Sequence, residues 1–560
     1  MTQPYRLPAG GSVDRANVLR FEYDGVGYAG YAGDTLASAL LANGVHLVGR
    51  SFKYHRPRGI VSAGTEEPNA LVQLARGDRA EPNARATTLE LYDGLIAASQ
   101  NCWPSVRFDI GAINNLIARF IPAGFYYKTF MWPPSPRWWL KYEHVIRHAA
   151  GMGRAGTAPD PDRYEHQYAH CDVLVIGGGT TGLAAASAAA GTGAHVMVCD
   201  ENPRWGGGAL DPDITIDGIA AAQWCADTVQ QLATQSNVTL LLRTTAFGFY
   251  DGNLVGAVER VADHLASQAP GAPRQRLWKI RAKAVVLASG AIERGIVFAN
   301  NDLPGTMLAN AARTYVQRYG VRPGKQAVVF TNNDGAYADA LVMHAAGIAV
   351  AAVVDVRPES QLSSGMPTRA RAAGIPVRAN SVIVGAHGTQ HVAAVDIALQ
   401  GGGPAQRVHC DLVCVSGGWN PAVHLFSQAR GKLRYDDALA AFVPASSPMP
   451  ILPAGAANGR FDLAAALLDG HAAGIASAAR AGSGSTTSRN APRAISSPAA
   501  ALQPLWAVPA GNASAKRFVD LQNDVTVDDI ALAAREGYQA VEHLKRYTTL
   551  GMGTDQGKTS

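Results

Sequence analysis

The segment Asp172–Glu201, DVLVIGGGTTGLAAASAAAGTGAHVMVCDE, constrains the fold of this chain more than any other stretch. Its apolar run Val173–Ile176 stops at three glycines, a stretch of small helix-forming residues follows, and a second apolar run ends at Cys199. Short, continuous apolar runs on either side of a helix are typical of a parallel sheet that is covered on both faces. The segment therefore predicts a strand, a tight turn, a helix and a second strand.

The glycines in this turn fit a dinucleotide-binding motif. Gly177, Gly179 and Gly182 occupy the glycine positions of G-x-G-x-x-G, which allow a tight turn, a close approach of the backbone to a pyrophosphate, and close packing of helix on strand. Asp200 and Glu201 follow about 20 residues later, where a carboxylate can bind ribose hydroxyls and would repel the 2′-phosphate of NADP. The motif does not separate FAD from NAD, because both present an adenosine ribose and a pyrophosphate.

Composition places the chain among ordinary multidomain proteins. The 560 residues suggest about three or four domains, and 49 basic against 44 acidic residues give a net charge of +5 without long charge runs. We expect no nucleic-acid or membrane partner from this balance. The six cysteines form no regular framework, and no apolar run reaches the roughly 18 residues of a membrane span, so a reduced, cytoplasmic protein is predicted.

The first predicted domain, residues 1–100, has the pattern of a β-grasp fold. Val18–Tyr23 and Val26–Tyr31 predict a hairpin, and a helix over Thr35–Asn43 is expected to start at Asp34 as N-cap. Further strands are expected at Ala70–Leu74 and Thr87–Leu91. In ferredoxins this fold carries a [2Fe–2S] cluster on cysteine thiolates, but residues 1–100 contain no cysteine, so no such cluster is expected.

Residues 101–170 are rich in Trp, Tyr, Phe and Pro, which favours an irregular connector or, alternatively, a subunit-contact surface. Residues 171–293 and 437–480 are predicted to form the dinucleotide domain, with a second Rossmann-like domain inserted at 294–436. The turn of that second βαβ unit, Thr331–Gly335, has one glycine and an acid where phosphate would lie, so we expect it to bind no second nucleotide. The predicted fold class is α/β, a flavoprotein-like fold with two dinucleotide-binding domains behind a cysteine-free β-grasp domain.

The carboxyl-terminal part divides into a predicted linker, residues 481–515, which is rich in Ser, Ala, Pro and Gly, and the start of another domain at 516–560. Thr526 is expected to cap one helix running from Val527 to about Arg546. Gly551–Thr559 resembles a P-loop but has the spacing G-x5-G-K-T, one residue too long, and it follows a helix rather than a strand. We therefore do not expect a P-loop there.

Several long phrases resemble the alpha subunits of heterotetrameric sarcosine oxidases. They include RSFKYHRPRGIV, NCWPSVRFDIGAINNL, LASGAIERGIVFANNDLPGTML and LQNDVTVDDIALAAREGYQAVEHLKRYTTLGMGTDQGKT, and they are spread over nearly the whole chain. The resemblance implies a chain that lacks a following aminomethyltransferase-like folate domain. Related alpha or A subunits of opine oxidases and hydrogen cyanide synthase share the central nucleotide architecture but look less similar at the termini.

The resemblance also implies function. These enzymes oxidise the N-methyl amine of sarcosine to glycine, formaldehyde and hydrogen peroxide. The alpha subunit would hold an NAD that does not cycle in electron transfer, would share an FMN with the beta subunit, and would assemble with beta, gamma and delta subunits. One-carbon transfer to folate would belong to the absent domain.

Carried over residue by residue, the resemblance gives the expected cofactor contacts. The pyrophosphate would meet Gly177, Gly179, Thr181 and Gly182; the adenosine ribose would meet Asp200, Glu201 and Asn202; and Gly208, Ala246 and Ala456 would line the rest. The family usually has Pro-Ala where this chain has Thr180-Thr181, which should alter the phosphate contacts without abolishing them. We expect no catalytic residue and no metal ligand in this chain.

Alternative functions remain open on the sequence alone. The same fold could hold FAD and act as a self-contained NAD(P)H-dependent oxidoreductase, or form the nucleotide-binding subunit of an opine-type amine dehydrogenase. A scaffold with a purely structural NAD is a third possibility. The altered turn Thr331–Gly335 weighs against the first of these, because hydride delivery needs a second nucleotide pocket.

Overall fold

A computed structural model describes residues 3–74, 77–125, 128, 132–209, 214–483, 490–496, 501–509 and 515–560. The chain divides into two compact units. Unit 1 comprises residues 1–161, 293–418 and 502–560, and unit 2 comprises residues 162–292 and 419–501. The predicted linker, residues 481–515, lies partly outside the described residues. Among the described helices, none is both long and apolar enough to cross a membrane.

Unit 2 is built on a seven-stranded sheet with the order β12-β9-β8-β15-β14-β13, in which β28 also pairs with β15. Strands β12, β9, β8, β15 and β28 are parallel, and β14 and β13 add an antiparallel edge. The strands are β8 (Tyr164–Ile176), β9 (Val196–Cys199), β12 (Val238–Leu241), β13 (Thr244–Tyr250), β14 (Leu254–Arg260), β15 (Gln275–Leu287) and β28 (Ile451–Pro453). Strands β8 and β9 confirm the predicted strands on either side of the glycine turn.

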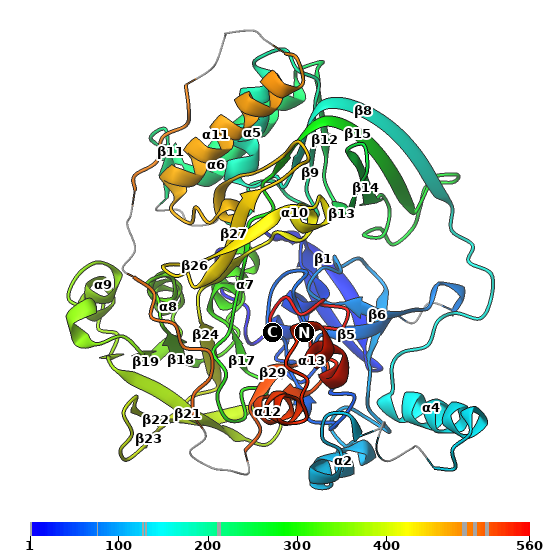
Figure 1. Ribbon diagram of the computed structural model, residues 1–560, viewed down its shortest axis with the longest axis vertical. Helices are drawn as coiled ribbons and strands as arrows, with labels where there is room; N and C mark the ends of the chain where they lie inside the picture. The colour runs from blue at the N-terminus through cyan, green and yellow to red at the C-terminus, as the bar shows by residue number, and fades with distance from the viewer. Residues whose placement is uncertain are drawn as a thin grey trace. The chain divides into compact units, whose positions relative to one another are not determined.

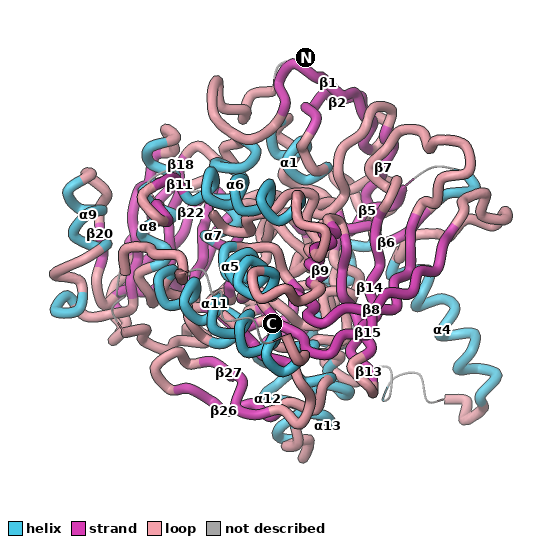
Figure 2. Tube along the Cα trace, turned by 90° about the horizontal axis from the view of Figure 1, so that it is seen from above, coloured by secondary structure: helices cyan, strands magenta, loops and turns pink. Residues whose placement is uncertain are grey.

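Three helices cover one face of this sheet (Figure 1). They are α5 (Thr180–Ala190), α6 (Ala221–Ala233) and α11 (Leu463–Arg480), and α5 and α11 lie side by side in both views (Figures 1 and 2). Alternate residues of β8 serve the two faces: Val173 and Val175 pack in the core under these helices, whereas Leu174 and Ile176 pack in a second core on the other face. The smaller elements are β10 (Thr215–Ile216), β11 (Ile219–Ala220), β25 (Trp419–Pro421), α10 (His424–Gln428), β26 (Lys432–Asp436), β27 (Ala441–Ser446) and η5 (Gly455–Asn458), with β16 (Ala291–Glu293) crossing the boundary between the units in sequence.

The amino-terminal part of unit 1 is a five-stranded sheet with the order β2-β1-β7-β5-β6. Its elements are β1 (Asp14–Tyr23), β2 (Val26–Ala32), α1 (Leu36–Ala42), β5 (Leu71–Leu74), η1 (Gly77–Arg79), β6 (Glu81–Arg85) and β7 (Leu95–Ser99), with a small pair of β3 (Gly49–Arg50) and β4 (Pro57–Arg58). The predicted hairpin is confirmed by the antiparallel pairing of β1 with β2.

Two predictions for this part were wrong in detail. The N-cap of α1 is Thr35, whose hydroxyl accepts the backbone N–H of Ser38, because Asp34 is instead engaged by Arg6 and the Ser38 hydroxyl. No strand covers 87–91; the sheet is completed by β6 at one edge and β7 at its centre. The backbone N–H groups of Leu36 and Leu91 donate to the carbonyl oxygens of Leu89 and Asp34. The loop is thus tied to the start of α1 rather than to a sheet.

The inserted part of unit 1 is a parallel sheet, β17-β24-β18-β19-β20. Strand β18, helix α8 and strand β19 confirm the predicted second βαβ unit. The elements are β17 (Thr306–Leu308), α7 (Ala309–Tyr319), β18 (Gln326–Thr331), α8 (Gly335–Ala345), β19 (Ala349–Asp355), η4 (Glu359–Gln361), α9 (Met366–Ala372), β20 (Val377–Arg378) and β24 (Leu412–Ser416), beside an antiparallel sheet of β21 (Ser381–Gly388), β22 (Val392–Leu399) and β23 (Gln406–His409). One hydrophobic core contains residues of both this part and the amino-terminal part, for example Leu40 of α1 and Val329 of β18.

The remaining elements of unit 1 correct two further predictions. Residues 101–170 contain the short turns η2 (Ile110–Ala112), α2 (Ile113–Leu116) and η3 (Ala118–Phe120). They also contain a 15-residue helix, α4 (Pro136–Ala150), where an irregular connector was predicted. Pro136 suits the first turn of this helix, and Gly151 ends it in a left-handed conformation. After β29 (Phe518–Asp520) and β30 (Val525–Thr526), the single helix expected after Thr526 is two, α12 (Val527–Arg535) and α13 (Val541–Thr548). Gly537, with φ +93°, lies in the break.

Candidate nucleotide-binding site

The turn between β8 and α5 can be built only from glycine at two of the predicted positions. Gly177 has φ +104°, and a Cβ there would lie 2.2 Å from the carbonyl oxygen of Ala288. A Cβ on Gly182 would lie 1.8 Å from the carbonyl oxygen of Gly177. The first glycine therefore allows the tight turn beside β15, and the third allows α5 to pack directly on the turn, as the motif predicts.

Gly179 differs from these two glycines, because there is open space where its side chain would be. A Cβ there would meet only Gly207 Cα at 3.9 Å. Gly179 is also the N-cap of α5, and the first N–H groups of a helix have no acceptor within the helix. The open space thus lies at the positive end of the helix dipole, which suits a pyrophosphate.

Asp200, at the end of β9, closes the turn from the other strand. Its Oδ2 accepts the backbone N–H of Gly178 at 2.6 Å, and its Oδ1 accepts the backbone and side-chain N–H groups of Asn202 at 2.8 and 3.0 Å. Only 7% of Asp200 is exposed. A carboxylate offers about four acceptor sites, so Asp200 can hold the turn and still accept a ribose hydroxyl.

A neighbour that the sequence did not suggest is Trp205. A Cβ on Gly178 would lie 2.2 Å from Cε3 of the Trp205 indole, and Gly206 donates its N–H to the carbonyl oxygen of Gly178 at 2.9 Å. The loop after β9 therefore returns across the glycine turn, and Gly178 must be glycine as well. The run Trp205-Gly-Gly-Gly208 is the only sequence signal for this return.

Thr181 faces away from the open side of the turn. A Cβ on Gly455 would lie 2.4 Å from Thr181 Oγ1, and one on Gly470 would lie 2.4 Å from the Thr181 carbonyl oxygen. The side chain therefore packs against η5 and α11, and the predicted pyrophosphate contact of Thr181 falls to its backbone N–H.

The remaining predicted residues lie on segments that the structure joins to this turn. Gly208 is exposed in the returning loop, where an added Cβ would meet open space, and Ala456 follows Gly455 in η5. Ala246 lies in β13, whose Thr244 donates its N–H to the Asp200 carbonyl oxygen at 2.8 Å. The carbonyl of Glu201 accepts a hydrogen bond from Arg260 at 2.7 Å. Which of these residues touch a cofactor stays a prediction.

The cysteines near the site are not prepared for redox chemistry. Cys199 at the end of β9 and Cys171 in β8 are buried, and burial raises the pKa of each thiol to about 12. The thiolate is the reactive form, so both stay inert at neutral pH. Among the described residues, no group of three or more His, Cys, Asp or Glu side chains could hold a metal ion.

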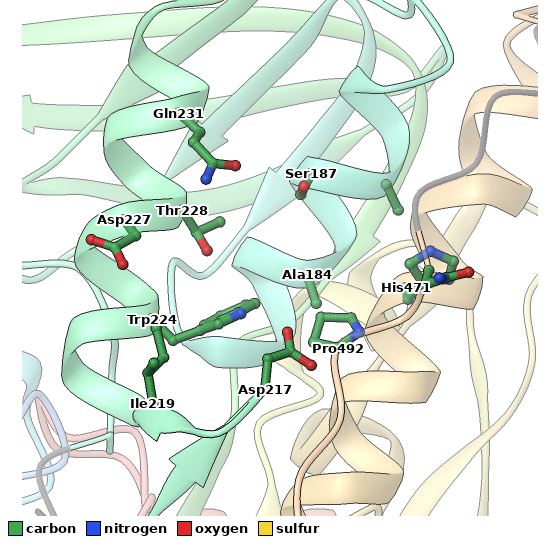
Figure 3. A pocket seen from close by; sticks show the side chains of 12 residues that line it. Ala184, Ser187, Asp217, Ile219, Trp224, Asp227, Thr228, Gln231, His471 and Pro492 are labelled. Carbon is green, nitrogen blue, oxygen red and sulfur yellow. The ribbon is translucent and has the colours of Figure 1, made fainter.

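A separate hollow of about 280 Å³ opens on the helix side of unit 2 (Figure 3). Trp224 and Thr228 of α6 face Ala184 and Ser187 of α5 across it. None of the ten predicted cofactor residues lines this hollow. The glycine turn at the carboxyl end of β8 and this helix-side hollow are therefore two different sites in unit 2.

Comparison with protein-family models divides the chain into three matches. Residues 16–102 match a 2Fe-2S iron-sulfur cluster binding domain, residues 171–441 match a pyridine nucleotide-disulphide oxidoreductase domain, and residues 514–560 match a sarcosine oxidase A3 domain. Cys102 is the only cysteine within 16–102, so the first of these segments cannot supply the thiolates of a cluster. The second match supports a flavin- or nucleotide-binding α/β domain at the glycine turn.

Whole-chain comparisons give the family. The alpha chain of sarcosine oxidase from Rhizobium meliloti (strain 1021) is 49% identical over 99% of this chain and 55% of its own length. The A-type chain of opine oxidase from Agrobacterium tumefaciens (strain Ach5) is 27% identical over 55% of this chain and 62% of its own length. A crystal structure of L-proline dehydrogenase from P. horikoshii shares the fold, with a TM-score of 0.64 at 19% identity, over 100% of this chain and 92% of that one.

These findings confirm the resemblance seen in the sequence. The chain spans about half the length of the sarcosine oxidase chain that it matches, and the opine oxidase match is weaker and shorter. Along almost all of its own length, the chain belongs to the family of sarcosine oxidase alpha subunits.

Proposed function

We propose that this chain is the NAD-binding part of the alpha subunit of a sarcosine oxidase-type complex. One observation carries the proposal: Gly179 leaves open space at the N-terminus of α5, directly beside a turn that Asp200 holds through Gly178. That geometry suits a dinucleotide pyrophosphate. The similarity of nearly the whole chain to sarcosine oxidase alpha subunits supplies the context.

The chain's own groups have distinct tasks in this proposal. The N–H groups of Gly179, Thr181 and Gly182 bind the pyrophosphate. The carboxylates of Asp200 and Glu201, with Asn202, bind the adenosine ribose and exclude the extra phosphate of NADP. Gly208, Ala246 and Ala456 line the rest of the pocket.

The complex then oxidises sarcosine with oxygen and water to glycine, formaldehyde and hydrogen peroxide. NAD would be a bound structural group in this chain, and an FMN shared with the beta subunit would supply electron-accepting chemistry to the complex. The cytoplasmic assembly contains beta, gamma and delta subunits in addition to alpha. This chain binds and positions cofactors and contributes no catalytic side chain.

A self-contained NAD(P)H-dependent flavoenzyme is the second candidate, because the fold could hold FAD in the same turn. The second βαβ unit disfavours it. Its turn is already bonded internally: Asp334 pairs with Arg357 at 2.8 Å, and the N–H of Gly335 donates to Asn333 Oδ1 at 2.9 Å. A phosphate would have to displace both contacts.

Cofactor identification separates these functions. The chain is purified alone and together with beta, gamma and delta subunits, each sample is denatured, and released nucleotides are identified by mass spectrometry and absorbance. We expect NAD from the isolated chain and FMN only from the assembly. FAD in the isolated chain, bleached by NADH, would overturn the proposal in favour of the flavoenzyme.

A further inference from the structure

Helix α4 has almost no core-facing side in this chain. Ala150, its last residue, is the only buried residue among its 15. Exposed residues include Trp138, Trp139, Leu140 and Val145. Isolated helices of about this length are marginal in water, and most helices in proteins are stabilised by packing of an apolar face. The packing partner of α4 is therefore absent from the described residues.

The preceding segment shows the same feature. Between residues 103 and 120, large apolar side chains point to solvent from η2, α2, η3 and the loop before them; the exposed ones are Trp103, Phe108, Ile110, Ile113, Leu116, Ile117 and Phe120. Leu116 is 81% exposed. Single exposed apolar residues are ordinary, but a group of this size marks an interaction surface.

His55 joins the two segments. Its Nδ1 lies 2.7 Å from Asp109 Oδ2, at the N-cap of η2, and its Nε2 lies 3.0 Å from the carbonyl oxygen of Ala149 in the last turn of α4. The backbone N–H of Asn101 also donates to the carbonyl oxygen of Gly151 at 3.0 Å. The two segments are thus anchored to the same part of unit 1, and we call their exposed residues together the connector face.

The connector face is basic as well as apolar. Residues 101–150 contain six Lys and Arg but only two acidic residues, Asp109 and Glu143. Asp109 is buried against His55, and Glu143 pairs with Arg147. Lys128 pairs with Glu536, so the cations of this segment besides Lys128 and Arg147 are Arg107, Arg119, Arg137 and Lys141. A matching surface would be apolar with acidic residues at its rim.

We propose that the connector face is the docking surface for another subunit, whose contact surface is apolar and acid-rimmed. The inference rests on the proposed function only for the choice of partner, the beta subunit. Trp, Phe and Arg are residues that interfaces concentrate at their centres, and a protein partner would supply the apolar packing that α4 lacks. A lipid surface and a second copy of this chain become outcomes of the test.

The test measures association of the chain with the beta subunit by sedimentation velocity at low and high salt. The variant Leu116→Glu/Leu140→Glu introduces acids into the connector face, and Leu399→Glu is the control, since Leu399 is 57% exposed on β22 against 62% for Leu140. We expect the double variant to raise Kd at least tenfold and the control to change it less than twofold. High salt should weaken wild-type binding. Leu116→Gln/Leu140→Gln repeats the test without added charge, and unfolding temperatures verify that each variant folds.

Several results would overturn the inference. The first is an unchanged Kd for the beta subunit in both double variants, and the second is no association of the wild-type chain with the beta subunit. The third is self-association of the wild-type chain that the double variant abolishes. The fourth is binding of the wild-type chain to anionic vesicles that the double variant loses while it still binds the beta subunit. NAD content is measured in the same samples. A chain that binds NAD but not the beta subunit contradicts the docking surface, whereas a chain that binds the beta subunit without NAD contradicts the proposed function.

Discussion

Gly179 and Gly182 lie three residues apart in the same turn, yet the same substitution should have opposite effects at the two positions. Gly179 has φ −72° and ψ −178°, which alanine adopts readily, and its Cβ would meet nothing closer than 3.9 Å. Gly179→Ala should therefore leave stability unchanged or raise it by about 0.4–1 kcal/mol through the unfolded state. Gly182→Ala places a methyl group 1.8 Å from a backbone oxygen, so its cost should exceed the roughly 1–3 kcal/mol of ordinary overpacking.

Nucleotide binding should respond differently from stability. The methyl group of Gly179→Ala would project into the open space before the α5 N-terminus, where we place the pyrophosphate. We expect Kd for NAD to rise at least tenfold, which corresponds to about 1.4 kcal/mol. Calorimetric titration with NAD gives Kd, and thermal unfolding gives stability.

The matched control is Gly401→Ala, because Gly401 also has open space around its Cβ position but lies in the loop after β22. This variant should bind NAD like the wild type. If Gly179→Ala folds and binds NAD with unchanged Kd, the pyrophosphate does not pass over Gly179 and the proposed geometry is wrong.

Three further predictions concern unit 1. Arg58 is buried between Asp302 and Asp524. Arg58→Met should lower the free energy of chemical unfolding by about 3–5 kcal/mol, because it leaves buried carboxylate charge. The control Arg371→Met breaks a partly exposed pair with Glu359 and should lower it by less than about 1 kcal/mol. Thr526 and Asp529 form a capping box at α12, and Thr526→Ala should cost about 1 kcal/mol by the same measurement. Burial raises the pKa of Asp520 from 3.8 to about 6, so its contribution to stability should be fully present below about pH 4 and lost as the pH rises through 6. A difference of about 2 in pKa corresponds to about 3 kcal/mol. Unfolding free energies of wild type and Asp520→Asn between pH 4 and 7 check this, and equal slopes in the two proteins would contradict it.

The sequence predicts the site better than its surroundings, for a physical reason. The role of Gly182 depends on its contact with Gly177, five residues away in the same βαβ unit, and Gly177 needs its positive φ for the turn itself. The indole of Trp205 lies over Gly178 because of the path of a loop, and the contact of Thr181 with Gly470 depends on where α11 docks. No periodicity or spacing encodes these contacts.

Helix α4 is a case in which composition and local end signals predict different structures. Its many aromatic residues and the prolines before it favoured an irregular connector, yet local signals at its ends, Pro136 and Gly151, suffice for a helix. The same kind of local signal, Gly537 with its positive φ, divides α12 from α13. The composition of residues 101–170 did not predict this helix, whereas the residues at its two ends are consistent with it.

The two βαβ units of the chain show why sequence motif and bonding must be considered together. In the first unit, Gly179 leaves the α5 N-terminus open. In the second, the Asn333 N–H donates to Thr331 Oγ1, the Gly335 N–H donates to Asn333 Oδ1, and Arg357 spans Asp334 and Asp355. The donors that a phosphate would need already have partners, and the carboxylate that a ribose would need is paired with a buried guanidinium. Binding a nucleotide there would break these contacts, so we expect any dinucleotide to bind at the first unit rather than the second.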